Sequence, residues 1–392
     1  MFRNKSAEKE ERRKSQRVIS RELKVNNWQT SKTKMKELNY MFVQAKWITN
    51  DMIANENIME YKYNEHKTVK HFDKDKNELF TEITLGAAIH QELCQKVQQD
   101  IKNLSKKKNK SKVGKLKFKS EVNCIPLRTG SFRLVNSRNI RIPGFKKITV
   151  RGIDNIPENA EFATAKLMKK ASGIYIVITC YVEKEKKNIS KEIGVDFGVK
   201  NTITTSEGKI YNCQVGESER LKRLSKKFNH SQKGSSSRNK LYKLLQKEYE
   251  HITNIRNDKG NKIYHELSRD TFVYYQDDNF NGWKSFNMGR KVQYGVLGRV
   301  KHHLSNSEYA LDVKRFCATT KVCSNCGTVK PEKLGLDVRT FECDECGAKL
   351  DRDVNAAINI KLLGQHKRPE SGIDFEKRDN PLASDSSDAK IA

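Results

Sequence analysis

The spacing of apolar residues predicts a helical block inside a strand-rich region in the first half of the chain. Residues 17–25 alternate partly between apolar and polar, as strands do, whereas residues 28–64 carry apolar positions at helical spacing. A second helix is expected over about 83–107, and the basic run 106–120 ends it. Residues 122–186 are again rich in strand-like segments. This half is therefore expected to be one β domain with a helical insertion.

The second half begins a new unit. Residues 192–211 predict two strands around a glycine-containing turn, and residues 218–270 follow as a long basic helical pattern with a Gly-Ser hinge at 234–237. A short apolar run at 271–275 is typical of a buried strand. The pattern ends with a helix over 354–364.

Between that strand and that helix, four cysteines predict a zinc ribbon. Cys323 and Cys326 form one Cys-x-x-Cys pair, Cys343 and Cys346 form another, and sixteen residues separate the pairs. Four thiolates at such spacing bind zinc tetrahedrally in a closed structural site, which leaves no position open for catalysis. A redox dithiol is the minor alternative.

Carboxylates stand at the ends of the predicted apolar elements. Asp196 follows one apolar strand, Asp277 and Asp278 follow another, and Asp353 opens the last helix. Carboxylates that converge in this way could hold a pair of divalent ions for phosphodiester hydrolysis. Taken singly, each aspartate is better explained by a turn or a helix cap than by catalysis, so the catalytic interpretation depends on their combination.

The charge balance indicates a polyanionic partner. The 392 residues include 77 Lys and Arg against 48 Asp and Glu, a formal net charge of +29, and the hydrophobic content is 36%. Such an excess favours nucleic-acid contact over a merely solvated surface. Four aromatic side chains could stack on bases or belong to cores, and the pattern does not decide between these roles: Trp28, Tyr40, Trp47 and Trp283.

The chain contains no apolar run long enough for a membrane span, and its N-terminal residues are polar, unlike a secretory signal. The five cysteines outside the pairs occur singly, which is typical of a reducing compartment. A cytoplasmic protein is therefore expected.

These motifs together resemble the TnpB proteins of bacterial insertion sequences, which are relatives of the type V CRISPR effectors. The resemblance extends over about residues 80–365 and is carried by IGVDFGVKNTITTSEGK at 193–209 and by CSNCG, RTFECDECG and LDRDVNAAINI around the cysteine pairs. It implies an RNA-guided DNA endonuclease of a transposable element. The guide RNA would derive from the transposon end, and its base pairing would read a double-stranded DNA target.

The resemblance also implies a mixed α and β, multidomain fold. A β-barrel wedge domain with a helical recognition insertion would precede an α/β RNase H-like (RuvC) domain with an inserted zinc ribbon. The expected boundaries are 1–16 for a disordered basic tail, 17–27 and 113–188 for the wedge-like β domain, 28–112 for the helical recognition insertion, 189–318 and 349–365 for the RuvC-like domain, 319–348 for the zinc ribbon, and 366–392 for a disordered C-terminal tail.

Residue by residue, the resemblance makes Asp196 the first and Asp353 the last carboxylate of a RuvC-like site, both as magnesium ligands. The usual middle glutamate is replaced by Gln276, and Asp278 stands two positions later, which in a strand is the same side. Aspartate is one methylene shorter than glutamate, enough to displace a metal ligand. The expected catalytic and magnesium-binding set is Asp196, Asp278 and Asp353, with Cys323, Cys326, Cys343 and Cys346 as zinc ligands.

Two functions follow from this substitution. Retention of Asp196 and Asp353 favours an active guided nuclease. Loss of the middle glutamate favours a nuclease-impaired, RNA-guided DNA-binding protein that acts as a transcriptional repressor. A general transposase is a weaker third possibility, because the chain lacks a tyrosine- or histidine-based strand-transfer signature.

Overall fold

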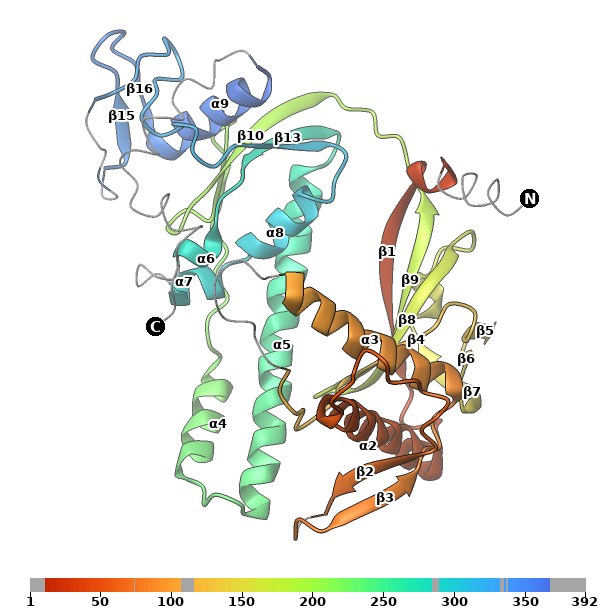
Figure 1. The fold of residues 1–392 in the computed structure, drawn as a ribbon. Helices are drawn as coiled ribbons and strands as arrows, with labels where there is room; N and C mark the ends of the chain where they lie inside the picture. The colour runs from red at the N-terminus through yellow and green to blue at the C-terminus, as the bar shows by residue number, and fades with distance from the viewer. Residues whose placement is uncertain are drawn as a thin grey trace. The chain divides into compact units, whose positions relative to one another are not determined.

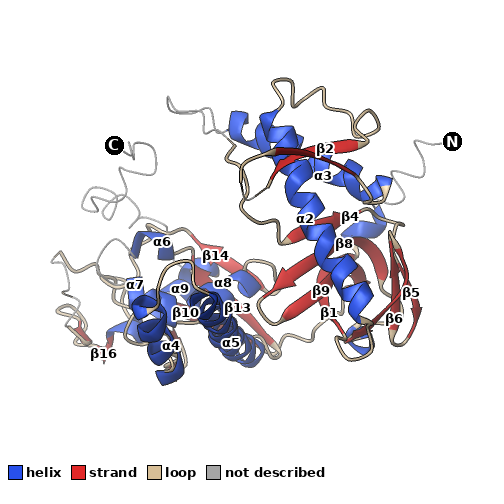
Figure 2. Cartoon of the chain, turned by 90° about the horizontal axis from the view of Figure 1, so that it is seen from below, coloured by secondary structure: helices blue, strands red, loops and turns tan. Residues whose placement is uncertain are grey.

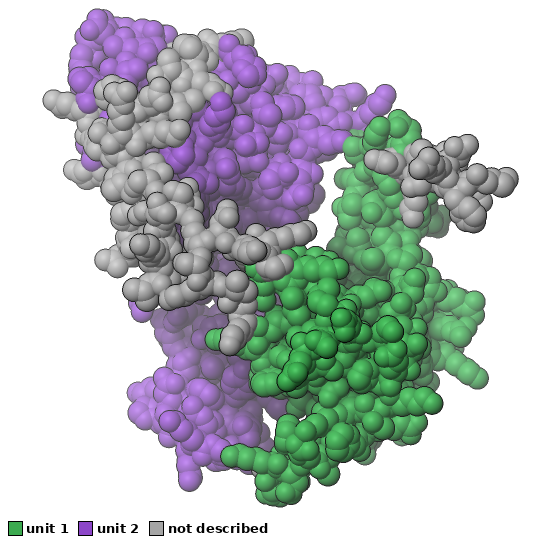
Figure 3. All heavy atoms as spheres, viewed as in Figure 1, with its two compact units in different colours: residues 1–185 green, residues 186–392 purple. Residues whose placement is uncertain are grey.

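A computed structural model shows two compact units, residues 1–185 and residues 186–392 (Figure 3). The residues described are 11–73, 75–106, 116–283, 289–331, 335 and 338–366. Both units combine helices and strands, so the predicted mixed, multidomain fold is confirmed. The C-terminal tail expected beyond residue 366 and the first ten residues of the expected N-terminal tail lie outside the described part.

The first unit is built on a seven-stranded antiparallel sheet with the order β4-β8-β9-β1-β7-β6-β5 (Figure 1). Its strands are β1 (Gln16–Val25), β4 (Cys124–Leu127), β5 (Arg133–Asn136), β6 (Asn139–Ile142), β7 (Phe145–Arg151), β8 (Glu161–Lys170) and β9 (Gly173–Glu183). The predicted strand at 17–25 is thus confirmed as β1. Because β4 and β5 end the order, the strands that the structure describes form an open sheet, and a closed barrel is not seen among them.

Two helices cover one side of this sheet, α2 (Lys32–Ala54) and α3 (Ala87–Lys106) (Figure 2). Ser31 caps α2 by accepting a hydrogen bond from Lys34 N. Between the helices, β2 (Thr68–Phe72) and β3 (Glu78–Glu82) form a hairpin that the apolar pattern did not predict. The region expected as a helical insertion is therefore helical at both ends and contains a hairpin.

Part of the expected N-terminal tail is tied to the sheet. Residues 11–14 form a helical turn. The Arg13 guanidinium lies 3.3 Å from the centroid of the Tyr181 ring and donates hydrogen bonds to Glu161. This stacked and bidentate contact fixes the turn against β8 and β9.

The second unit holds a five-stranded sheet with the order β12-β11-β10-β13-β14. β10 (Lys191–Phe197), β13 (Thr271–Gln276) and β14 (Ala310–Val313) run parallel, while β11 (Ile203–Thr205) and β12 (Ile210–Tyr211) continue antiparallel. The helices of this unit are α4 (Glu219–His230), α5 (Ser236–Leu267), α6 (Phe280–Trp283), α7 (Gly289–Tyr294), α8 (Leu297–Leu304) and α9 (Arg352–Gly364). The predicted strands at 192–211 and 271–275 and the terminal helix are confirmed.

Strand alternation decides which side chains face which helix. Val195 and Val273 belong to the core formed with α5 and α8. Their neighbours Gly194 and Tyr274 point the opposite way, toward α9. Asp196 and Gln276 each lie two residues beyond Gly194 and Tyr274 along the same strands. Their side chains therefore leave the sheet on the face that α9 covers.

Helix α9 packs unusually close to β10. A Cβ added to Gly194 would lie 1.9 Å from Ala357 O and 2.8 Å from Lys361 N, which are backbone atoms of α9. Only glycine permits this approach. The contact sets the distance between the strand that carries Asp196 and the helix that carries Asp353. None of the helices described here has the length and apolar character needed to cross a membrane.

Candidate active site beside a zinc ribbon

The three predicted carboxylates gather at one edge of the second sheet. Asp196 lies near the end of β10, and Asp278 follows the end of β13, the parallel neighbour of β10. Asp353 lies in the first turn of α9, which packs on both strands. Because carboxyl ends of parallel strands meet at one edge, the parallel pairing brings these residues, 157 positions apart from first to last, into one region.

The electrostatics of Asp196 show that the three groups are close enough to interact. Desolvation of its carboxylate raises the pKa of Asp196 well above the usual range, and the nearby charges of Asp278 and Asp353 raise the pKa further. Arg352 opposes this effect only in part. A desolvated carboxylate beside two others is a group whose ionisation a divalent cation would favour.

Asp353 is 7% exposed and is held by three donors. Asn201 Nδ2 lies 3.0 Å and Arg339 Nη1 3.3 Å from Asp353 Oδ2, while Arg352 lies 3.4 Å from Oδ1. Asp351 caps α9 by accepting hydrogen bonds from the backbone N–H groups of Asp353 and Val354. The cap and the donors fix this carboxylate at the start of the helix.

Asp277 and Asp278 have different surroundings. Lys301 Nζ, from α8, lies 2.5 Å from Asp277 Oδ1 and 2.6 Å from the backbone oxygen of Asp278. Arg315 Nε donates to the backbone oxygen of Asp277 at 2.9 Å. Asp277 is therefore paired with Lys301, and it is the Asp278 charge that acts on Asp196. The two adjacent acids therefore differ in their electrostatic surroundings.

Gln276, which replaces the expected glutamate, is 6% exposed and has its own hydrogen-bond network. Its Nε2 points at three backbone oxygens, those of Lys314 (3.3 Å), Arg315 (2.9 Å) and Cys317 (3.0 Å). Its Oε1 accepts from Thr319 Oγ1 at 3.3 Å. An amide nitrogen suits this ring of acceptors, and a carboxylate oxygen would face like partial charges there.

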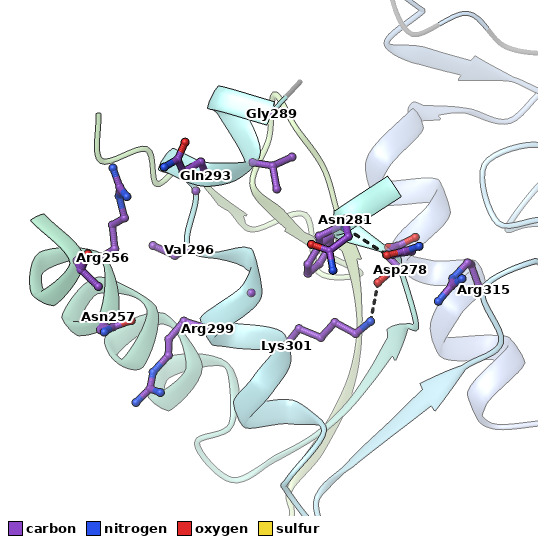
Figure 4. A pocket seen from close by; sticks show the side chains of 16 residues that line it. Arg256, Asn257, Asp278, Asn281, Gly289, Gln293, Val296, Arg299, Lys301 and Arg315 are labelled. Atoms are coloured by element: carbon purple, nitrogen blue, oxygen red, sulfur yellow. Dashed lines mark hydrogen bonds between the residues drawn. The ribbon is translucent and has the colours of Figure 1, made fainter. Parts of the chain in front are cut away.

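A basic cavity of about 870 Å³ adjoins Asp278 (Figure 4). Figure 4 shows Lys301 extending from α8 toward Asp278, with Arg315 on the other side of that aspartate. Arg256 from α5 and Arg299 from α8 line the part further from it. Four cations against one carboxylate make the cavity suited to a phosphate-bearing strand.

The four predicted zinc ligands are brought together. The Sγ atoms of Cys323, Cys326, Cys343 and Cys346 all lie within 4.8 Å of one another, and within the described ranges this is the one group of three or more potential ligands at such spacing. The carboxylate oxygens of Asp196, Asp278 and Asp353 do not form such a group at this spacing. A hydrogen bond with Thr328 lowers the pKa of the Cys326 thiol to about 6, toward the thiolate that zinc requires.

Each cysteine pair forms the same backbone turn. Gly327 N donates to Cys323 O, and Gly347 N donates to Cys343 O, at 3.0 and 2.9 Å. Both glycines have positive φ, at 88° and 67°. β15 (Thr340–Glu342) and β16 (Lys349–Asp351) pair beside them. This geometry fits a structural zinc site.

Two asparagines of α9 attach the helix to this ribbon. Asn355 accepts from Ser324 N and donates to Val322 O, each at 2.8 Å, and Asn359 donates to Thr319 O and Val322 O at 2.8 and 2.6 Å. Both side chains are buried. Their spacing of four residues places them on one helix face.

Sequence reasoning missed these asparagines, as well as Asn201, Arg339 and Lys301. Buried amides in an apolar helix pattern were a usable signal for Asn355 and Asn359. No comparable signal marks Arg339 or Lys301, because their partners are set by the path of distant loops.

Comparison with known proteins shows what parts of this chain are similar to. Residues 305–360 match the family model of the Cas12f1-like TNB domain, which covers β14, the cysteine pairs and the start of α9. Curated relatives include "Putative RNA-guided DNA endonuclease" of Streptomyces pristinaespiralis, 28% identical over 55% of this chain, and "TnpB-like protein L79" of Acanthamoeba polyphaga mimivirus, 28% identical over 47% of this chain. The predicted resemblance is confirmed: over about half of its length the chain is similar to proteins named as RNA-guided DNA endonuclease and TnpB-like.

The match to these relatives is partial. The alignments span 56% of the Streptomyces protein and 38% of the viral one. Among solved structures, the Cas12f1 chain of a Cas12f1-sgRNA-target DNA complex is 14% identical, with a TM-score of 0.48 and coverage of 84% of this chain and 83% of that one. A chain of a CRISPR-Cas12f ternary complex gives 15% identity and a TM-score of 0.29, with 85% of each chain covered.

Proposed function

We propose that this chain is an RNA-guided DNA endonuclease that hydrolyses phosphodiesters in a metal-dependent reaction. The observation that carries the proposal is the coupling of Asp196 to Asp278 and Asp353 at one sheet edge, next to a cavity lined by four cations. A concentration of negative charge inside a basic surface suits divalent ions that bind together with a phosphate-bearing strand.

Asp196, Asp278 and Asp353 are the residues proposed to hold Mg²⁺, which when bound supplies an activated water and stabilises the leaving oxygen. The remaining residues act on position and charge. Arg339 and Arg352 hold Asp353, and Lys301 fixes the backbone of Asp278. The cavity beside Asp278 is proposed to orient the scissile strand by its phosphates.

The partners are proposed to be a guide RNA derived from a transposon end and a double-stranded DNA target. The net charge of +29 supports extensive contact between the protein surface and nucleic acid. The seven-stranded sheet with α2 and α3 is proposed to be the wedge-like domain with its recognition insertion, and the second unit the RuvC-like domain with the zinc ribbon. A nucleoid location would follow from the DNA partner.

The test is cleavage of a plasmid that carries a matching target, with protein purified together with its co-expressed RNA. Asp196→Ala, Asp278→Ala and Asp353→Ala should each abolish cutting in Mg²⁺ and leave guided binding intact. Asp277→Ala is the matched control, because that carboxylate is paired with Lys301. Cutting that persists in all three variants would refute the site.

The nuclease-impaired repressor is the less favoured alternative. It depends on Gln276 being the remnant of a lost metal ligand, whereas the contacts of Gln276 support a structural role that leaves Asp278 as the middle acid. Guided binding without cutting by the natural chain, and cutting by an Asp278→Glu variant, would favour that alternative.

A further inference from the structure

A second cavity, of about 570 Å³, lies in the first unit at the start of α2. It is lined by Asn27, Thr30, Lys32, Met35, Lys36, Asn39, Tyr40, Val43 and Lys169. Three of these are lysines, and none of the described residues that line it is acidic. Met35, Tyr40 and Val43 contribute apolar wall. A cavity with an apolar wall and cations around it suits a base attached to a phosphate.

Thr30 provides an independent sign of a missing ligand. The residue is 7% exposed, and within the described part of the chain its Oγ1 is buried without a hydrogen-bond partner. A buried hydroxyl that lacks a partner is costly, on the order of 1–3 kcal/mol. Thr30 is among the residues that line the cavity, so its hydroxyl lies beside the space that an occupant with a donor or acceptor would enter.

The turn before α2 presents an exposed tryptophan. Trp28 is 92% exposed and lies between Asn27 and Thr30, both of which line the cavity. The turn itself is ordered by Asn26, whose side chain accepts from Trp28 N at 3.1 Å and whose backbone oxygen accepts from Thr30 N at 3.0 Å. The solvent-exposed indole of Trp28, on a turn whose backbone is fixed, can stack on a base.

We propose that this cavity binds an unpaired nucleotide of a nucleic-acid strand, with Trp28 stacking on an adjacent base. Lys32, Lys36 and Lys169 would contact phosphates, and the Thr30 hydroxyl would bond the base or sugar that enters. The inference rests on the proposed function in that the chain binds nucleic acid, and it adds a contact that the acidic site does not use.

The experiment combines affinity with a local readout, using the full chain freed of co-purified RNA. Labelled single strands of about 16 nucleotides, as RNA and as DNA of one sequence, are titrated by fluorescence anisotropy. The variants are Trp28→Ala, Thr30→Val and Lys36→Gln. The controls are Phe118→Ala, another exposed aromatic of this unit, and Lys146→Gln, another exposed lysine. Strands with 5-iodouracil are also photo-crosslinked and the adducts mapped by mass spectrometry.

We expect an adduct at Trp28 and a loss of affinity of about tenfold in Trp28→Ala, the effect of one base–aromatic stack. Lys36→Gln should lower the slope of log affinity against log salt by about 0.7. The controls should bind like the natural chain. Adducts with RNA alone would assign the cavity to the guide, and adducts with DNA alone to the target; either supports the proposal.

Two results would overturn it, and they are distinguishable. Binding that is the same in the three variants and the natural chain, with adducts only outside residues 26–43, would refute this site and leave the proposed function standing. A natural chain that binds neither RNA nor DNA would refute the proposed function and this inference together.

Discussion

Replacing Gln276 with glutamate, the residue that the TnpB pattern has at this position, should lower the stability of the folded chain. In Gln276→Glu, one carboxylate oxygen would occupy the position of Nε2, facing the backbone oxygens of Arg315 and Cys317 at about 3 Å. The ionised form would have no donor for either acceptor and would be buried. The folded state would therefore take up a proton, so that the neutral acid could donate one hydrogen bond.

The cost can be worked from the ordinary pKa of glutamate, about 4.3. Because pH 7 lies roughly 2.7 units above that pKa, holding the acid protonated there costs about 3 to 4 kcal/mol of folding free energy. At pH 5 the same constraint costs only about 1 kcal/mol. The raised pKa in the folded state means that the variant keeps most of its stability near pH 4 and loses it as the pH rises.

Urea denaturation followed by circular dichroism at pH 5 and pH 7 measures this difference. Gln232→Glu, which adds the same charge at an exposed position, is the control. Plasmid cleavage is measured on the same samples. A Gln276→Glu variant as stable as the natural chain at pH 7 that also cuts faster would refute the structural role and make position 276 a metal ligand.

Three further outcomes test the geometry around the carboxylates. With divalent ions removed by a chelator, Asp196→Asn should be more stable than the natural chain near pH 7 and equal to it near pH 4. The raised pKa of Asp196 means that the natural chain loses stability as the pH rises, whereas asparagine does not titrate. A pH-independent difference in thermal melts would contradict this. Gly194→Ala should destabilise the second unit by about 1–3 kcal/mol and slow cleavage by roughly 100-fold, since the added Cβ displaces α9, whereas Gly298→Ala, where the space is open, should be tolerated. Cys323→Ser should release zinc and lower the melting temperature, and unchanged zinc in a metal analysis would refute the ribbon.

The elements that the sequence predicted are those whose pattern is local. The strand that ends near Asp196 and the one that ends at Gln276 are short apolar runs, and the ribbon follows from cysteine spacing alone. The hairpin β2–β3 was missed because its strands, TVKHF and ELFTE, mix charged and aromatic residues without a clear alternation. The short helices α6 to α8 were missed for a similar reason, since none reaches three full turns.

The roles of individual side chains were less accessible. Sequence left Trp28 and Trp47 open between stacking and core; the structure exposes Trp28, and places Trp47 against the core of the first unit. Gln276 was interpreted as a deficient ligand, because its acceptors lie some 40 residues away along the chain and depend on the path of a loop. The sequence shows which residue is substituted, but it does not show the distant hydrogen-bond partners that give the new residue its role.

Helix α9 belongs to both the cysteine ribbon and the proposed acidic site, so the two are linked mechanically. Zinc bound by the four cysteines would fix the turn that begins at Cys323. Ser324 and Val322, next to that cysteine, are hydrogen-bonded to Asn355, two residues after Asp353. On its other side the same helix contacts the strand that carries Asp196. A carboxylate that must lie beside two others against their mutual repulsion needs a rigid support, and a ribbon held by zinc would supply it. The zinc is thus expected to matter for cleavage through the position of Asp353, without taking part in the chemistry.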